Sequence, residues 1–270
     1  GMLGLRETIS ESVILSFLFL AGICSTALLT PLVMRLARKL KAVDHGVSPD
    51  ENRPAVPTLG GLGVAIPLLI FGVIMSGMIL AGPQPRGWMM KIWERFYHTV
   101  PSGFNLIGRS ILILSVGGIA VIILGLIDDL RSLRARGKLL GQFIIAVFIC
   151  AGGITIRYVY IPLIGSISLG PAAGIPITIL WIVGLINAFN LIDGLDGLAA
   201  GVGLIASAAL VVLGTVIGTP ISVLICTVLA GSLTGFLFFN FLPARIYLGD
   251  TGSMFIGYIL ATVTLMRFSG

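Results

Sequence analysis

Charged residues are scarce in this sequence: they make up 10% of its 270 residues, whereas soluble domains average about 25%. Cysteine and histidine are scarce as well. The three cysteines, Cys24, Cys150 and Cys226, lie inside apolar segments, which excludes a disulfide framework. The two histidines, His45 and His98, stand away from every carboxylate motif, so we expect neither to act as a base or a metal ligand. A soluble enzyme and a disulfide-stapled domain are both excluded.

Apolar residues make up 57% of the chain and gather in long runs. About 20 apolar residues cross the hydrocarbon core of a bilayer, and the Gly218-Thr219-Pro220 break divides the uncharged stretch 197–244 into two such runs. We therefore predict an all-α polytopic membrane protein, with residues 1–270 as a single integral membrane domain. Its eight expected transmembrane helices lie near 12–34, 57–81, 107–127, 139–156, 174–189, 198–217, 221–241 and 252–268.

Loops of this topology alternate between two sides of the membrane. The side with loops 35–56, 128–138, 190–197 and 242–251 carries ten Lys/Arg residues against seven on the other, which predicts that it is cytoplasmic. All seven aspartates also fall there: Asp44, Asp50, Asp128, Asp129, Asp193, Asp196 and Asp250. On the other side we expect a small β-hairpin near 157–171, where β-branched and aromatic residues surround an Ile-Gly-Ser turn, and an amphipathic interfacial segment at 82–106.

The stretch 187–199 places Asn187, Asn190, Asp193 and Asp196 at intervals of three between two uncharged segments. Carboxylates beside membrane-length apolar runs are costly, so such groups are usually functional. A spacing of three places side chains on one face of a helix or helical turn. The alternative is a loop at a helix end, with Asp196 as the N-cap of a helix that begins near Leu198. Capping accounts in part for the presence of Asp196, but it does not explain why Asn and Asp recur at every third position.

Two further motifs carry carboxylates. Asp128 and Asp129 end the third expected helix, where negative charge opposes the helix dipole, and bases follow them at 131, 134, 136 and 138. Carboxylate oxygens suit Mg²⁺ or Ca²⁺, and acids beside bases suit a metal-bound diphosphate; the alternative is a solvated loop with neutralised charges. Asp250 lies between glycines just before the last expected helix, where Thr251 and Ser253, with free N-terminal amides, could cap the helix or hold a phosphate oxygen.

Three sequence stretches, GLIDDL…RARGKLLGQ, NAFNLIDGLDGLAAG and FNFLPARIYLGDTGS, resemble the polyprenyl-phosphate N-acetylhexosamine-1-phosphate transferases, a superfamily that includes the phospho-MurNAc-pentapeptide translocases. The similarity runs from about residue 40 to 260. It implies that a UDP-sugar gives its sugar phosphate to undecaprenyl or another polyprenyl phosphate, with Mg²⁺ or Mn²⁺, and that UMP is released. RARGKLLGQ and ARIYLGDTGSMFIG resemble the UDP-N-acetylglucosamine enzymes, which we favour, whereas AVPTLGG resembles the pentapeptide translocases.

The resemblance also implies roles for single residues. Asp250 matches the principal Mg²⁺ ligand, and the expected catalytic residues are Asp128, Asp129, Asp193 and Lys138. Asn187, Asn190, Asp196, Arg134 and Arg136 are expected to bind substrate. The Pro57-Thr-Leu-Gly-Gly61 stretch matches the motif that opens the second helix, with tight glycine packing as the alternative to a binding role.

Family members usually have about ten helices and a later histidine-containing loop, so we expect this chain, which ends at Gly270, to lack that loop and the last helices. The expected partners are a UDP-sugar, a polyprenyl phosphate and the cell (inner) membrane, with the active site facing the cytoplasm. Whether the chain forms a homodimer is left open, and no nucleic-acid partner is expected. The rival from another class is a cation transporter, whose carboxylates would lie near the bilayer midplane within broken helices.

Overall fold

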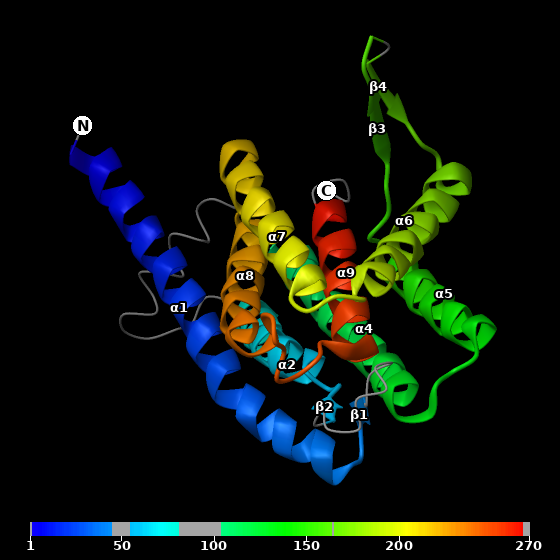
Figure 1. The fold of residues 1–270 in the computed structure, drawn as a ribbon. Helices are drawn as coiled ribbons and strands as arrows, with labels where there is room; N and C mark the ends of the chain where they lie inside the picture. Colours follow the sequence, from blue (N-terminus) through cyan, green and yellow to red (C-terminus); the bar gives the residue numbers. More distant parts are fainter. Residues whose placement is uncertain (1, 45–54, 81–103, 164, 267–270) are drawn as a thin grey trace.

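The computed structural model describes residues 2–44, 55–80, 104–163 and 165–266, and these form a bundle of helices with two small hairpins (Figure 1). The part of the chain outside the described residues includes 82–103 of the expected interfacial segment. It also includes both histidines and Asp50. The helices in this part of the chain are α1 (Met2–Lys39), α2 (Gly61–Leu80), α4 (Phe104–Arg131), α5 (Ala135–Ala151), α6 (Pro171–Ile192), α7 (Leu198–Ile217), α8 (Pro220–Asn240) and α9 (Gly249–Leu265).

Six of these helices are long and apolar enough to cross a membrane, namely α1, α2, α4, α6, α7 and α8, whereas α5 and α9 have 17 residues each. Large apolar side chains also point outward along the bundle: Leu28, Ile123, Leu180 and Ile205 are 53–74% exposed. Soluble monomers rarely expose so much contiguous apolar surface. The chain is a multi-pass membrane protein, and the predicted all-α class with eight helices is confirmed.

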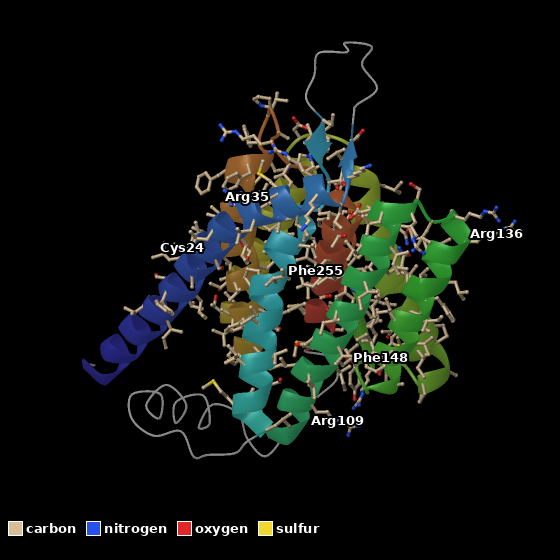
Figure 2. All side chains as sticks on the ribbon, turned by 90° about the horizontal axis from the view of Figure 1, so that it is seen from below. Cys24, Arg35, Arg109, Arg136, Phe148 and Phe255 are labelled. Carbon is tan, nitrogen blue, oxygen red and sulfur yellow. The ribbon has the colours of Figure 1, made fainter. Side chains whose placement is uncertain are left out.

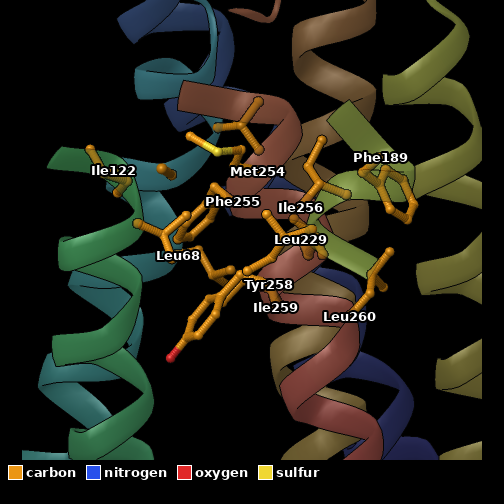
Figure 3. Close-up of a cluster of buried hydrophobic side chains, with 14 of the residues drawn as sticks. Leu68, Ile122, Phe189, Leu229, Met254, Phe255, Ile256, Tyr258, Ile259 and Leu260 are labelled. Carbon is orange, nitrogen blue, oxygen red and sulfur yellow. The ribbon is translucent and has the colours of Figure 1, made fainter. Parts of the chain in front are cut away.

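The centre of the bundle is α9, surrounded by α2, α4, α6 and α8 (Figure 3). Its Phe255 and Tyr258 side chains are fully buried, and Leu68, Ile122 and Leu229 of the neighbouring helices belong to the same core cluster. The Tyr258 hydroxyl donates a hydrogen bond to the carbonyl of Leu114 at 2.9 Å, which satisfies the one polar atom of that side chain. The helix that begins with the GDTGS motif is therefore held firmly along its length.

Several helix boundaries differ from those predicted, and two differences concern the candidate site. The fifth helix was expected at 174–189 but spans Pro171–Ile192, so Asn187 and Asn190 are both helical and only residues 193–197 form the loop. The last helix begins at Gly249 rather than 252, which places Asp250 inside its first turn. Helix α2 begins at Gly61 rather than 57, because Val56–Pro57 forms strand β2.

The predicted hairpin near 157–171 is confirmed as β3 (Tyr158–Ile161) paired antiparallel with β4 (Gly165–Ser168). A second pair, β1 (Val43–Asp44) with β2, was not predicted, since two-residue strands leave no alternating pattern to read. The two hairpins lie at opposite ends of the bundle, and the carboxylate motifs share the end of β1 and β2 (Figure 1).

Candidate active site

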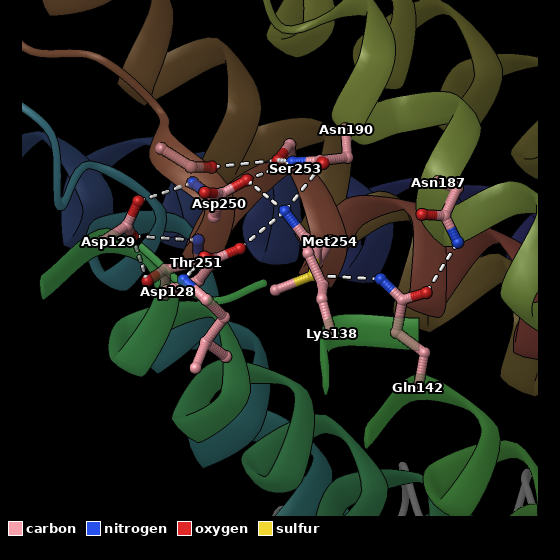
Figure 4. A network of polar contacts seen from close by, with 12 residues as sticks. Asp128, Asp129, Lys138, Gln142, Asn187, Asn190, Asp250, Thr251, Ser253 and Met254 are labelled. Atoms are coloured by element: carbon pink, nitrogen blue, oxygen red, sulfur yellow. Dashed lines mark hydrogen bonds and ion pairs between the residues drawn. The ribbon is translucent and has the colours of Figure 1, made fainter. Parts of the chain in front are cut away.

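The three carboxylate motifs meet where α4 ends, α5 begins, α6 ends and α9 begins (Figure 4). Lys138, in the first turn of α5, is the centre of this cluster. Its ammonium lies 2.7 Å from Oδ2 of Asp128 and 2.7 Å from Oδ1 of Asp250, and it donates to Oδ1 of Asn190 at 2.8 Å. All three N–H groups of the ammonium therefore have a partner, each from a different helix.

Exposure differs among the members of the cluster. Asp128 is 6% exposed, Lys138 14% and Asp250 30%, so the cluster opens toward solvent on the Asp250 side. Asp128 also accepts the backbone N–H of Leu133 at 2.7 Å, which fixes the short connection between α4 and α5. Asp128 thus contacts Lys138 on the buried side of the cluster. A ligand that arrives from solvent would reach Asp250 before Asp128.

Asn190 connects the end of α6 to α9. Its amide nitrogen donates to Oδ1 of Asp250 and, at 3.0 Å, to the hydroxyl of Ser253, which in turn donates to the carbonyl of Gly249 at 3.0 Å. The structure thus places Asn190 beside Asp250, and its predicted role in substrate binding stays a prediction. The Ser253 hydroxyl is thereby committed to the first turn of its own helix.

Asp129 has a different set of partners from those of Asp128. It accepts the N–H of Asp250 at 2.8 Å, the N–H of Thr251 at 3.0 Å and the Thr251 hydroxyl at 2.5 Å. Thr251 and Ser253 were expected to cap this helix or to hold a phosphate oxygen. In the structure the N–H of Thr251 already donates to a carboxylate from α4, so this amide is not free. Sequence alone could not show that this cap comes from another helix.

A second polar layer lies one helical turn deeper than the cluster (Figure 4). Asn187 donates to Oε1 of Gln142 at 2.6 Å, and Gln142, which is fully buried, donates to the sulfur of Met254 at 3.4 Å. The structure therefore places Asn187 beside Gln142, and its predicted role in substrate binding stays a prediction. Gln142 was not predicted, although its position four residues after Lys138 puts both side chains on one face of α5.

The 193–197 loop is tied to the segment that precedes α9. Oδ2 of Asp196 accepts the N–H of Ala244 at 2.9 Å, while the buried Asn240 accepts the N–H of Gly197 at 3.1 Å and donates to the carbonyl of Ile246 at 2.9 Å. The expectation that Asp196 caps α7 is wrong: Gly197 is the N-cap residue, with φ of 74°, and no side chain caps that end. Asn240 was also not assigned a role from sequence.

Asp193 directly follows α6 as its C-cap residue, and its side chain has no hydrogen-bond donor among the described residues. Burial raises its pKa to about 7, and the negative charges of Asp250 and Asp129 add to this rise. The ammonium of Lys138 contacts two of the four carboxylates, Asp128 and Asp250, whereas Asp129 bonds to α9 and Asp193 has no donor among the described residues. A site of this composition attracts a cation.

The two predicted substrate-binding arginines lie apart from the cluster. Arg134 and Arg136 are exposed, and no hydrogen bond or ion pair joins either side chain to another described residue. Arg136 projects outward from α5 (Figure 2). The structure leaves their role as a prediction.

Glycines pack the start of α2 against the start of α9. Gly61 and Gly252 are in backbone contact, since a Cβ on Gly61 would lie 2.1 Å from the nitrogen of Gly252. The N–H groups of Gly60 and Gly61 donate to the carbonyls of Tyr247 and Leu248 at 3.0 and 2.8 Å. Tight packing thus accounts for the glycines of the PTLGG stretch.

The model of "Glycosyl transferase family 4" matches residues 111–267, which contain every member of the cluster. The chain belongs to this family. The predicted relationship to the polyprenyl-phosphate N-acetylhexosamine-1-phosphate transferases is confirmed at the level of the family.

Two relatives of this family 4 chain, each 34% identical to it in sequence, carry N-acetylglucosamine in their names. One is a probable undecaprenyl-phosphate N-acetylglucosaminyl 1-phosphate transferase of Bacillus subtilis, with 92% of this chain and 62% of the relative covered. The other is a decaprenyl-phosphate N-acetylglucosaminephosphotransferase of Mycobacterium leprae, with 98% and 64% covered. A phospho-N-acetylmuramoyl-pentapeptide-transferase of Shouchella clausii is 28% identical, with 93% and 74% covered. The chain thus spans less than two thirds of the length of the first two relatives.

The donor atoms of this family 4 site fit the expected Mg²⁺. Among the described residues, no group of three or more His, Cys, Asp or Glu side chains is placed to hold a metal. Mg²⁺ does not require such a group, because it is usually bound by one or two carboxylates together with waters and substrate phosphates. Asp193 lacks any described donor and Asp250 is more exposed than Asp128, so Asp193 and Asp250 could supply the protein ligands.

Proposed function

We propose that this chain carries the core of an enzyme that transfers an N-acetylhexosamine-1-phosphate, with N-acetylglucosamine favoured, from a UDP-sugar to a polyprenyl phosphate at the cytoplasmic surface of the cell membrane. The observation that carries the proposal is the bonding of Lys138 to Asp128, Asp250 and Asn190, which joins three motifs at one end of a membrane bundle. Membership of glycosyl transferase family 4 supports the reaction class.

The reaction joins two anions, so electrostatic stabilisation and positioning should dominate. An oxygen of the lipid phosphate attacks the phosphorus that carries the sugar, the bond from that phosphorus to the bridging oxygen breaks, and UMP leaves with that oxygen. The lipid phosphate needs little help from a base, because the second pKa of a phosphate monoester is about 6. Direct attack and a two-step route through an aspartyl intermediate both use these residues.

Lys138 is the described cation best placed to neutralise the diphosphate. Its side chain is 14% exposed at the centre of the cluster, and a phosphate oxygen could replace Asn190 or Asp250 as one of its partners. Asp128 is buried below it and keeps the ammonium in place when such an exchange occurs. Asp193 and Asp250 would hold Mg²⁺, which when bound supplies charge neutralisation for the diphosphate.

The position of the carboxylates argues against a cation transporter. Carboxylates of that class are expected near the bilayer midplane within broken helices, whereas Asp128, Asp129 and Asp250 lie at helix ends on one end of the bundle. The phospho-MurNAc-pentapeptide substrate stays as the alternative within the family, since a relative of that name is 28% identical over most of this chain.

The test is release of UMP by the purified chain in detergent with undecaprenyl phosphate and Mg²⁺. UDP-N-acetylglucosamine, UDP-N-acetylgalactosamine and UDP-MurNAc-pentapeptide are compared, and omission of the lipid is the control. The proposal expects lipid-dependent UMP release, fastest with UDP-N-acetylglucosamine. UMP release that is fastest with the pentapeptide donor would replace the sugar assignment, and no release with any donor would contradict the proposed reaction for this chain.

A further inference from the structure

We infer that Asp129 is a positioning residue: it caps the N-terminus of α9 from a neighbouring helix and thereby fixes the carboxylate of Asp250. This inference rests on the proposed function for its consequences in catalysis, but the structural relationship can be tested without turnover. It departs from the expectation, drawn from the family resemblance, that Asp129 is itself catalytic.

Both carboxylate oxygens of Asp129 accept hydrogen bonds from the start of α9. Oδ1 accepts the N–H of Asp250 at 2.8 Å, and Oδ2 accepts both the N–H and the hydroxyl of Thr251 at 3.0 and 2.5 Å. A helix N-terminus stabilises negative charge, because its first N–H groups have no partner within the helix and the helix dipole is positive there. Asp129 is thus fully engaged by the protein, whereas Asp193 has no donor in the described part of the chain.

The backbones around this contact are closely packed. A Cβ added to Gly125, one helical turn before Asp129, would lie 2.5 Å from Cα of Thr251, so α4 and α9 are in backbone contact there. Gly249 has φ of 73°, and a Cβ there would lie 2.0 Å from the carbonyl oxygen of Thr58 and 2.9 Å from Oδ1 of Asp129. The backbone of Asp250 is therefore confined between α4 and the start of α2.

The consequence concerns the orientation of Asp250. Its backbone N–H is bound by Asp129, while its side chain is bound by Lys138 and Asn190. Loss of the backbone contact would release the first turn of α9 and displace the Asp250 carboxylate. A displacement of about 1 Å near a reacting centre can cost on the order of 100-fold in rate.

Three single variants test this inference. Asp129→Asn replaces one acceptor oxygen with a donor, so the N–H groups of Asp250 and Thr251 cannot both be satisfied. Thr251→Val removes only the hydroxyl that donates to Asp129. Thr262→Val is the matched control, because Thr262 is also fully buried on α9 but its hydroxyl bonds only within that helix, to the carbonyl of Tyr258 at 2.8 Å.

The readout that does not need turnover is hydrogen–deuterium exchange of the whole chain in detergent. We expect the amides of Asp250 and Thr251 to exchange about ten-fold faster in Asp129→Asn, with exchange in the core of α6 unchanged. Thr262→Val should leave the amides of Asp250 and Thr251 as protected as in the parent. Unchanged protection of both amides in Asp129→Asn would overturn the inference, whether or not the chain has the proposed activity.

Measurement of turnover then distinguishes a positioning role of Asp129 from a direct role in the reaction. We expect UMP release to fall on the order of 100-fold in Asp129→Asn and about ten-fold in Thr251→Val, because both break the same contact. The Asp129→Asn/Thr251→Val double variant should be no worse than Asp129→Asn alone, since the two effects are coupled. Full activity in Thr251→Val, with severe loss in Asp129→Asn, would instead show that Asp129 acts on the substrate.

Discussion

The ammonium of Lys138 lies 2.7 Å from Oδ1 of Asp250, although 112 residues separate the two in the chain. The same ammonium lies 2.7 Å from Oδ2 of Asp128. One cation thus joins the motif that ends α4 to the motif that begins α9, and its loss would leave neighbouring carboxylates without a counter-charge.

Removal of this cation should cost both stability and activity. Lys138→Met leaves Asp128, which is 6% exposed, without its partner, and breaking a buried ion pair costs about 3–5 kcal/mol. We expect a lower apparent Tm in detergent and a loss of UMP release of about 100-fold or more. Thermal unfolding and the UMP assay measure the two effects separately.

A double variant provides the control for Lys138→Met. Asp128→Asn combined with Lys138→Met removes the uncompensated charge, so we expect most of the lost stability to return while activity stays low. Recovery of activity together with stability would show that Lys138 has only a structural role.

Asp196 offers a test of loop anchoring against direct substrate binding. Its side chain accepts the N–H of Ala244 at 2.9 Å, and an asparagine oxygen can accept the same bond. We expect Asp196→Asn to keep UMP release within about five-fold of the parent and Asp196→Ala to lose more than that, since only the alanine leaves the N–H unpaired. Equal, severe losses in both variants would favour the predicted role of the Asp196 charge in substrate binding.

The pKa of Asp193 predicts a pH dependence of stability. Burial and the charges of Asp250 and Asp129 raise this pKa from 3.8 to about 7, so the folded protein binds a proton more tightly than the unfolded chain does. The stability contributed by the protonated form is complete below about pH 3.8 and is lost as the pH rises to about 7.

Thermal unfolding of the parent in EDTA should therefore show a Tm that falls between pH 5 and 8, and Asp193→Asn should show a smaller fall. Asp193→Asn is the suitable comparison because it removes the titrating group and keeps the size of the side chain. The same pH slope in parent and variant would show that Asp193 does not titrate in this range.

The positions of the helices and the gathering of the aspartates at one end could both be predicted from the sequence. Apolar runs of membrane length can be recognised in the sequence itself. The hairpin near 157–171 is indicated by its β-branched and aromatic residues, although Gly165 and Ser166 of the expected turn belong to β4. The end of each run is less certain. The fifth helix continues through Asn190 because an apolar segment can extend over polar residues that find partners on neighbouring helices, here Lys138, Gln142 and Asp250.

The division of labour among the aspartates could not be predicted. Asp128 and Asp129 are adjacent in sequence, yet one bonds to Lys138 on α5 and the other to the backbone of α9, because successive residues of a helix point about 100° apart. Gln142 and Asn240 carried only a weak signal, a polar residue at the edge of an apolar run. Their partners are set by tertiary packing between segments distant in the chain.

The role of Asp250 is the central claim, and Asp250→Asn tests it most directly. Asparagine keeps the size of the side chain and can still accept a hydrogen bond from Lys138, but it removes the negative charge that a hard cation needs. The measurement is UMP release from UDP-N-acetylglucosamine and undecaprenyl phosphate, with Thr262→Val as the matched control on the same helix. We predict that Asp250→Asn extracts and elutes like the parent but shows no turnover, whereas Thr262→Val stays active. Retention of more than about a tenth of the parent's activity by Asp250→Asn would contradict the assignment of Asp250 to the metal site.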